Sequence, residues 1–277
     1  MLTADDRAIN TPETIHWPLQ HIPGEYVMAE QLISRKEIAP ASIFCVGKNY
    51  PKHAREIERM EGIERQESSG SRPEPIIFLK PSTALETSGE ILMPSFQGRP
   101  LSDDMHYEVE LVLLVGSPTD GCSLEEAPSL IRGIGVGLDM TLRDVQFDDR
   151  KKGHPWLKSK GFRKSALISD FVPCTPEMLA SNPEISLELN GRTVQEGRMK
   201  EMIHCPEELL HYLSYLYGLR RDDLIFTGTP DGVGRVSIGD RLSARLSLSG
   251  SGRGSAQEIR LEATVQEFKP TTISGTA

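Results

Sequence analysis

The segment Glu108-Val109-Glu110-Leu111-Val112-Leu113-Leu114-Val115 alternates like a β-strand at its start and becomes continuously apolar at its end. Successive side chains of a strand point to opposite faces, so Glu108 and Glu110 share one face with Val112 and Leu114. Because both faces become apolar toward Val115, we expect the strand to run into the core. The two glutamates then lie side by side, about 7 Å apart, at the edge of that core.

Carboxylates in such a position repel each other, and their desolvation is costly unless a positive charge compensates it. An E-x-E pattern alone more often marks a sheet edge whose polar face meets water. Asp139 favours the buried interpretation, because it follows a second apolar, glycine-rich strand predicted from Gly133 to Leu138. Three carboxylates that converge from two strands would form an oxygen-rich site suited to Mg²⁺ or Mn²⁺, with Ca²⁺ as an occupant in crystals. No cluster of Cys or His indicates zinc.

A dense polar stretch, residues 139–146, begins at Asp139. If a helical turn starts there, Arg143 and Gln146 lie near the face of Asp139, at i+4 and i+7. A lone Arg or Lys is usually a solvated surface charge. Here, however, three carboxylates and one divalent ion have a net charge of −1. Adding the charges of Arg143 and Lys160 changes the local net charge to +1. The positive sum would attract an anionic substrate.

The rest of the chain predicts a β-rich α+β domain with few helices, because short strands alternate with Gly and Pro turns. One helix is expected at 206–217, with Pro206 in its first turn and Gly218 after its last residue. The charged segment 58–74 is interpreted as a mobile loop. Further strands are expected at 43–46, 76–79, 106–115, 224–227, 241–248 and 259–268.

Composition excludes several functional classes. The chain has 277 residues and a net charge of −9 without a basic stripe, so nucleic acid is not an expected partner. No apolar run approaches the roughly 20 residues of a membrane span, and the polar N-terminus has no apolar signal region. The four widely spaced cysteines are typical of reduced thiols in a cytoplasmic protein: Cys45, Cys122, Cys174 and Cys205.

Seven segments, taken together and in this order, resemble the fumarylacetoacetate hydrolase family, with the closest similarity to its acylpyruvate-cleaving and oxaloacetate-decarboxylating branch. They are VGKNYPKHAREI (46–57), IIFLKPSTAL (76–85), HYEVEL (106–111), GLDMTLRDVQ (137–146), KKGHPWLKSKGF (151–162), LNGRTVQEGRMKEMI (189–203) and FTGTPDGVG (226–234). The resemblance implies a mixed β-sandwich roll with a few short helices over residues 43–270, between an N-terminal extension (1–42) and a C-terminal tail (271–277). It also implies a Mg²⁺ or Mn²⁺ site and a homodimer.

The resemblance further implies roles for individual residues. In the family the E-x-E glutamates and the aspartate before R-D-x-Q bind the metal, and these positions match Glu108, Glu110 and Asp139. The substrate-binding positions match Asn49, Arg143, Gln146 and Thr229, and a catalytic lysine matches Lys160.

The family motif N-Y-x-x-H-x-x-E places a catalytic pair on a lid, and it matches His53 and Glu56. At i and i+3 the two are neighbours on a helix, and a carboxylate beside an imidazole orients it as a general base. Without the resemblance, a surface salt bridge would be the more common interpretation of such a pair. The charged segment 58–74 directly follows and would close over a bound substrate, as active-site lids do.

The expected activity is metal-dependent hydrolysis of a C–C bond in acylpyruvate-type 2-oxo acids, or decarboxylation of oxaloacetate, through a metal-bound pyruvate enolate. One alternative is an isomerase or decarboxylase of unsaturated 2-oxo diacids in aromatic catabolism. Another is a non-catalytic ligand-binding protein on the same scaffold. Arg163 and Lys164 depart from the family pattern, and they either favour a more anionic substrate or face solvent.

Overall fold

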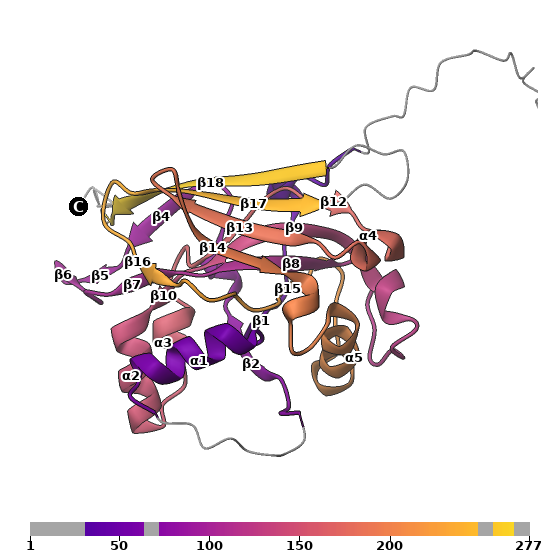
Figure 1. Cartoon of the computed structure of the whole chain (residues 1–277), viewed down its shortest axis with the longest axis horizontal. Coiled ribbons are helices and arrows are strands. Elements are labelled where there is room, and N and C mark those ends of the chain that lie inside the picture. Colours follow the sequence, from indigo (N-terminus) through magenta and orange to yellow (C-terminus); the bar gives the residue numbers. More distant parts are fainter. Residues whose placement is uncertain (1–30, 64–71, 249–256, 269–277) are drawn as a thin grey trace, which may run out of the picture.

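The computed structural model describes residues 31–63, 72–248 and 257–268, in which two β-sheets pack face to face and short helices gather at one side (Figure 1). The fold is a β-rich α+β fold in which a curled mixed sheet carries few short helices, as predicted. Most of the predicted N-terminal extension, the predicted C-terminal tail and the middle of the charged segment 58–74 lie outside the described residues. Within the described ranges, no helix is long and apolar enough to cross a membrane.

The larger sheet has eight strands in the order β2-β1-β15-β8-β9-β11-β3, with β12 beside β9. It is mixed, since β1 pairs with β15 in parallel while β8 pairs with its neighbours β15 and β9 in antiparallel fashion. Its strands are β1 (Ile43–Gly47), β2 (Ile76–Lys80), β3 (Leu85–Glu86), β8 (Val109–Val115), β9 (Ile131–Asp139), β11 (Ala166–Ile168), β12 (Val172–Pro173) and β15 (Leu224–Phe226).

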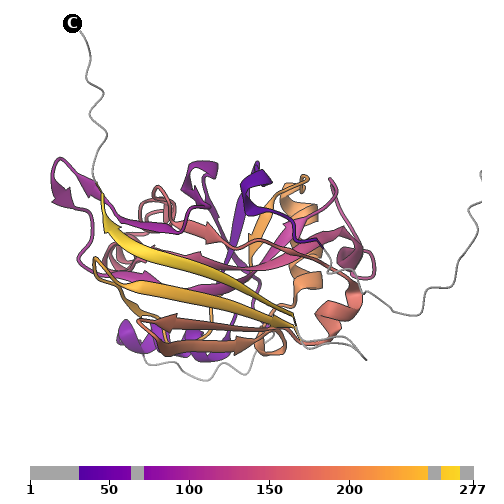
Figure 2. The same ribbon diagram turned by 90° about the horizontal axis from the view of Figure 1, so that it is seen from above.

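The second sheet has five strands in the order β14-β13-β17-β18-β4 and covers one face of the first, with β17 and β18 over β9 and β13 over β8 (Figure 2). A three-stranded sheet and a short hairpin complete the β-structure. The strands of the five-stranded sheet are β4 (Glu90–Met93), β13 (Glu184–Leu189), β14 (Arg192–Arg198), β17 (Arg241–Leu248) and β18 (Gln257–Glu267). The three-stranded sheet consists of β7 (Met105–Tyr107), β10 (Thr141–Leu142) and β16 (Gly234–Arg235). The hairpin pairs β5 (Ser95–Phe96) with β6 (Arg99–Pro100).

Strand β8 has an apolar core on each face, as its sequence predicts. Leu111 and Leu113 belong to the larger core cluster, which also holds apolar side chains of the five-stranded sheet. Val112 and Leu114 belong to a second cluster on the opposite face, together with Phe226 of β15. A strand buried on both faces needs no polar alternation, so the glutamates at its start are the exception that requires a local explanation.

The helices are α1 (Pro51–Met60), α2 (Arg143–Lys152), α3 (Leu157–Lys160), α4 (Pro176–Ala180) and α5 (Pro206–Tyr217), and 3₁₀ turns occur at Arg35–Glu37, Ser82–Ala84, Ala127–Leu130 and Met199–Glu201. Helix α5 has the predicted bounds, and Gly218 after it adopts a positive φ of 66°. The prediction of a loop from residue 58 is wrong at its start, because α1 continues to Met60. Its buried face, formed by His53, Ala54 and Ile57, holds the helix against the domain, while its basic residues Lys52, Arg55 and Arg59 are exposed.

Two further predictions near the carboxylates need correction. The single strand expected at 106–115 is interrupted at Glu108, which joins β7 to β8. Asp139 does not start a helical turn: it ends β9, and the helix begins only at Arg143. The reason is that Thr141 and Leu142 pair with β7, which keeps the chain extended for two more residues.

Candidate metal centre and substrate pocket

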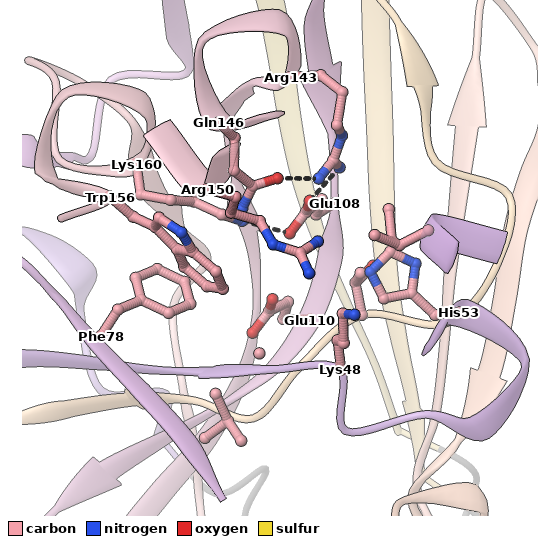
Figure 3. A pocket seen from close by; sticks show the side chains of 14 residues that line it. Lys48, His53, Phe78, Glu108, Glu110, Arg143, Gln146, Arg150, Trp156 and Lys160 are labelled. Carbon is pink, nitrogen blue, oxygen red and sulfur yellow. Dashed lines mark hydrogen bonds and ion pairs between the residues drawn. The ribbon is translucent and has the colours of Figure 1, made fainter. Parts of the chain in front are cut away.

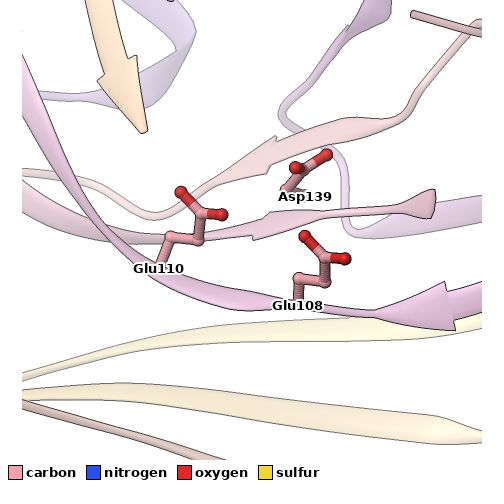
Figure 4. Close-up of side chains that lie close together, drawn as sticks. All are labelled: Glu108, Glu110 and Asp139. Carbon is pink, nitrogen blue, oxygen red and sulfur yellow. The ribbon is translucent and has the colours of Figure 1, made fainter. Parts of the chain in front are cut away.

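The pairing of β8 with β9 brings the three predicted metal ligands together. Glu110 lies opposite Gly137 in the antiparallel register, and the amide of Asp139 donates to the carbonyl of Glu108 at 2.9 Å. Glu108 and Asp139 are therefore cross-strand neighbours, and Glu110 is on the same face one pleat further along. Each carboxylate has an oxygen within 4.8 Å of an oxygen of the other two, and all three side chains are buried (Figure 4).

Gly137 makes this close arrangement possible. A Cβ at this position would lie 2.7 Å from the Leu167 carbonyl oxygen, from the Phe226 ring and from Val112. Real Cβ atoms do not approach so closely, so a larger residue would displace β8 beneath Glu110. The glycines of β9 thus serve tight packing beside the site.

Glu108 is held as an anion by two cations. Its Oε1 accepts a hydrogen bond from Nη2 of Arg143, and its Oε2 accepts one from Nζ of Lys160 at 2.7 Å. Burial raises the pKa of this carboxyl, but Lys160 and Arg143 outweigh burial and hold its pKa well below the ordinary value. Glu108 therefore offers a permanent negative charge in the centre of the cluster.

Glu110 is in the opposite situation. Its Oε2 accepts a hydrogen bond from the amide of Gly228 at 2.7 Å. Burial raises its pKa well above the ordinary value, and the negative charges of Asp139 and Glu108 raise it further. A carboxylate crowded by two others in a buried position is stabilised as an anion only when positive charge is added beside it.

Asp139 lies between two lysines. Its Oδ2 is 2.6 Å from Nζ of Lys160, and its Oδ1 is 2.7 Å from Nζ of Lys80. Lys80 is 1% exposed, and its ammonium also lies against the carbonyl oxygens of Met140 and Lys160 and the hydroxyl of Ser165. The sequence interpretation missed this lysine, although it ends strand β2 within a segment that carried the family resemblance.

The three carboxylates fit a hard divalent cation. Their donor set is oxygen only, which suits Mg²⁺ and Mn²⁺ and argues against zinc. Asp139 Oδ1 is buried and makes no hydrogen bond within the described part of the chain, although it faces the Lys80 charge. Three carboxylates balance Lys80, Lys160 and Arg143, so a bound divalent ion would bring the local sum to +2 rather than the predicted +1. Glu108, Glu110 and Asp139 are the residues that would hold it.

A partly open pocket lies beside this centre, and Figure 3 shows the side chains that line it. Glu108 and Glu110 form part of its lining, whereas Asp139 is fully buried behind it. Polar and apolar side chains from six separate stretches of chain surround the pocket: Lys48, His53, Phe78, Arg143, Gln146, Arg150, Trp156, Lys160 and Thr229. A pocket lined by several cationic groups and two aromatic rings suits an anionic ligand.

Helix α1 places the predicted dyad at this pocket. Nδ1 of His53 lies 3.1 Å from Oε2 of Glu56, and Oε1 of Glu56 accepts a hydrogen bond from the amide of Gly232 at 3.0 Å. Burial raises the pKa of Glu56, but the hydrogen bonds from His53 and Gly232 lower it below its ordinary value. An anionic partner at Nδ1 favours the tautomer in which Nε2 is free to accept a proton.

The other predicted substrate-binding residues divide into two groups. Gln146 and Thr229 line the pocket, where Gln146 accepts a hydrogen bond from Arg143 at 2.6 Å and Thr229 accepts one from Gln195 at 2.9 Å. Asn49 is buried outside the lining. Its side chain bonds the backbone of His204 and the carbonyl of Thr227, so its geometry is that of an anchor for the loop after β1.

The extra cations at positions 163 and 164 lie away from the pocket. Lys164 forms ion pairs with Glu86 at 2.8 Å and Glu90 at 2.7 Å. Arg163 lies over the ring of Phe268, 6.0 Å from its centroid. Neither residue is part of the pocket lining, so the alternative that they favour a more anionic substrate is not supported.

Several known proteins match most of this chain. Residues 42–265 match the family described as Fumarylacetoacetate (FAA) hydrolase C-terminal. The oxaloacetate tautomerase YcgM of Escherichia coli is 38% identical over 206 residues, which cover 73% of this chain and 87% of that protein. The mitochondrial oxaloacetate tautomerase FAHD1 of Bos taurus is 36% identical over 204 residues, 73% of this chain and 86% of its own.

Among solved structures, a fumarylpyruvate hydrolase from Pseudomonas aeruginosa in complex with Mn²⁺ and pyruvate superimposes with a TM-score of 0.70 and 31% identity. The match covers 90% of this chain and all of that chain. A relative with this architecture therefore binds a divalent metal of the type that an oxygen-only carboxylate cluster suits.

Proposed function

This chain belongs to the fumarylacetoacetate hydrolase family, and we propose that it is a divalent-metal-dependent enzyme acting on small 2-oxo acids. The proposed reaction splits a C–C bond of an acylpyruvate with water, which yields a carboxylic acid and pyruvate. Decarboxylation of oxaloacetate is the related reaction, in which loss of CO₂ produces the same enolate of pyruvate. Support comes from the relatives, which are named for oxaloacetate and for fumarylpyruvate, and from a solved relative that holds Mn²⁺ and pyruvate.

The observation that carries the proposal is the shared pocket of an acidic cluster and a His–Glu pair. His53 lines the same pocket as Glu108, Glu110 and Lys160, although these residues come from distant parts of the chain. An imidazole that is hydrogen-bonded to a carboxylate can act as a general base. Cations beside it stabilise the anion that forms when the proton is removed. A non-catalytic binding protein would need the charges but not the oriented base.

In this reaction each residue of the site would have a separate role. Arg143 and Lys160 make the centre attractive to the carboxylate of the 2-oxo acid. When bound, a divalent ion supplies Lewis-acid polarisation of the 2-oxo group. Nε2 of His53 takes a proton from water, and the resulting hydroxide attacks the distal carbonyl. The C3–C4 bond then breaks, its electron pair forms the enolate, and a proton returned to C3 gives pyruvate.

Keto–enol tautomerisation of oxaloacetate is a second candidate, because two relatives with that name each match 73% of this chain. The reaction needs only the transfer of a proton between the oxygen at C2 and the carbon at C3, with no attack by water. His53 and Lys160 are both placed at the pocket to take part in such a transfer. Isomerisation of unsaturated 2-oxo diacids would use the same kind of enolate, and it belongs in the same substrate panel.

Removal of the metal is expected to abolish turnover. Purified protein with Mg²⁺ or Mn²⁺ should release pyruvate from acetylpyruvate, fumarylpyruvate or oxaloacetate, measured by a coupled lactate dehydrogenase assay. EDTA should reduce the rate to background, because the ion stabilises the charge that develops in the transition state by several kcal/mol. Excess Mg²⁺ should restore the rate, whereas preformed Mg–EDTA should have no effect. Turnover that is insensitive to chelation would reject the metal-dependent reaction.

Replacement of His53 by alanine is expected to separate chemistry from metal binding. Hydrolysis should fall by about 10²- to 10⁴-fold, the usual contribution of a general base. The affinity for Mn²⁺ in titration calorimetry should change little, because His53 is not one of the three carboxylates that would hold the ion. His154→Ala is the matched control, since His154 is exposed and outside the pocket lining. Normal hydrolysis by the His53 variant would show that the dyad assignment is wrong.

A further inference from the structure

Helix α2 carries a third side chain into the pocket, Arg150, which the sequence interpretation did not consider. Arg143, Gln146 and Arg150 follow one another at i, i+3 and i+7, so they lie along one face of the helix. All three line the pocket, and the guanidinium of Arg150 projects into it (Figure 3). Arg143 approaches Glu108, whereas Arg150 lies nearly two turns further along the helix, toward the helix that carries His53.

The ion pair of Arg150 differs from those of Arg143 and Lys160. Arg143 and Lys160 contact the carboxylate cluster directly. Nη1 of Arg150 instead bonds Glu61, the residue that follows α1. The side chains of Arg150 and Glu61 are 27% and 11% exposed, so the pair lies at the boundary between pocket and solvent. Because the pair uses only Nη1, the planar guanidinium keeps further N–H donors for an acceptor in the pocket.

Two aromatic rings also line the pocket. They belong to Phe78 and Trp156, whose centroids are 5.6 Å apart in an edge-on arrangement. A ligand bound at the carboxylate cluster would therefore share the pocket with two aromatic rings and with a partly desolvated guanidinium. An arginine fork binds a carboxylate through two parallel hydrogen bonds, and a site of reduced polarity strengthens the interaction.

We infer that Arg150 is a specificity-determining residue that binds a second carboxylate, at the distal end of the substrate. The inference rests on the proposed function, in which the carboxylate cluster and its ion hold the 2-oxo acid end. It deepens that function by naming the preferred class: dianionic 2-oxo acids are bound better than monoanionic ones of the same length. Glu61 then positions Arg150 and links it to α1, the helix that carries the base His53.

The test compares two ligands that differ only at the distal end. 2-Oxoglutarate and 2-oxovalerate have the same chain length, but the first ends in a carboxylate and the second in a methyl group. Neither has the 1,3-dicarbonyl unit that hydrolysis requires. Their dissociation constants for the Mg²⁺-loaded full chain are measured by titration calorimetry. Wild-type protein should prefer 2-oxoglutarate by about 10- to 100-fold, the value of a charge-assisted hydrogen bond.

Three variants assign the preference to the Arg150 charge. Arg150→Gln should lose the preference, so that the ratio of the two constants falls to within about threefold of unity. Arg150→Lys keeps the charge without the fork and should retain part of the ratio. Lys151→Gln removes a charge from the next, exposed position of α2 and should leave the ratio unchanged.

Other outcomes would overturn the inference. If Arg150→Gln weakens both ligands equally, Arg150 only ties α2 to α1. If the ratio survives in Arg150→Gln, another residue binds the distal carboxylate. Failure of the proposed function has a different signature: no substrate of the panel is turned over, although the two ligands are still distinguished by charge. Failure of the Arg150 inference alone appears as turnover of the panel together with a ligand ratio that is absent or does not depend on Arg150.

Discussion

Glu110→Gln is expected to abolish divalent metal binding and to reduce turnover by at least about 10³-fold, because one of three carboxylates loses the charge that attracts the ion. This position gives a cleaner test than its neighbours. The hydrogen bond to Glu110 comes from the amide of Gly228, and a glutamine oxygen can accept it equally well. Burial and the two adjacent carboxylates already raise the pKa of Glu110, so the neutral amide resembles the form favoured without an ion.

The stability of the metal-free protein should therefore change by less than about 1 kcal/mol in the Glu110→Gln variant, measured by denaturant unfolding. The exposed Glu125→Gln is the control for loss of one negative charge. Glu108→Ala should also lose the metal. It also removes the buried carboxylate beside Arg143 and one of the two carboxylates that contact Lys160, however, so reduced activity there has two causes. A Glu110→Gln protein that binds Mn²⁺ as wild type does would remove Glu110 from the metal site.

The burial of the strand that carries the glutamates could be predicted, because the sequence pattern that indicates it lies within the strand itself. A strand with apolar side chains on both faces must be buried on both, and the structure places Leu111 and Val112 in two different core clusters. Carboxylates at the start of such a strand are then near the core by necessity. The convergence of Asp139 with them was also predictable, since it ends the next buried strand along the chain.

Other features depend on pairings that no local pattern contains. Asp139 was expected to begin a helical turn, but the pairing of Leu142 with Met105 keeps the backbone extended. Helix α1 continues past the point where its charged sequence suggested a loop, because Ile57 is anchored on the domain. The presence of Arg150 at the pocket follows from its position two turns along α2, and this became visible only once the start of that helix was known.

Lys80 is the clearest example of a residue whose position could not be predicted from its local sequence. A lysine at the end of a strand is usually solvated, and nothing near it in sequence explains its burial. Its partner Asp139 belongs to β9, which is four strands from β2 in the eight-stranded sheet. Residues 160–165, which also contact the ammonium, come from a further segment beyond α2. Only the assembled sheet brings these groups together.

Lys80→Met is therefore expected to destabilise the metal-free protein by about 3–5 kcal/mol, because Asp139 loses one of its two buried cations and remains desolvated. Saturating Mg²⁺ should recover part of this loss, since a bound ion supplies positive charge beside the same carboxylate. Urea unfolding of wild type and variant, with EDTA or with Mg²⁺, measures both quantities. The exposed Lys158→Met controls for the loss of a lysine charge.

The double variant Lys80→Met/Asp139→Asn identifies the cause of the destabilisation. If the cost comes from an uncompensated carboxylate, removing that charge should restore at least about 1–2 kcal/mol in metal-free protein, and the two changes will not be additive. If the cost instead comes from the carbonyl and hydroxyl groups that lose the ammonium, the double variant will be no more stable than Lys80→Met. Equal stability of Lys80→Met and wild type without metal would contradict the buried ion pair. In the first case Lys80 stabilises the acidic cluster when the ion is absent, and in the second it stabilises the carbonyl and hydroxyl groups around its ammonium.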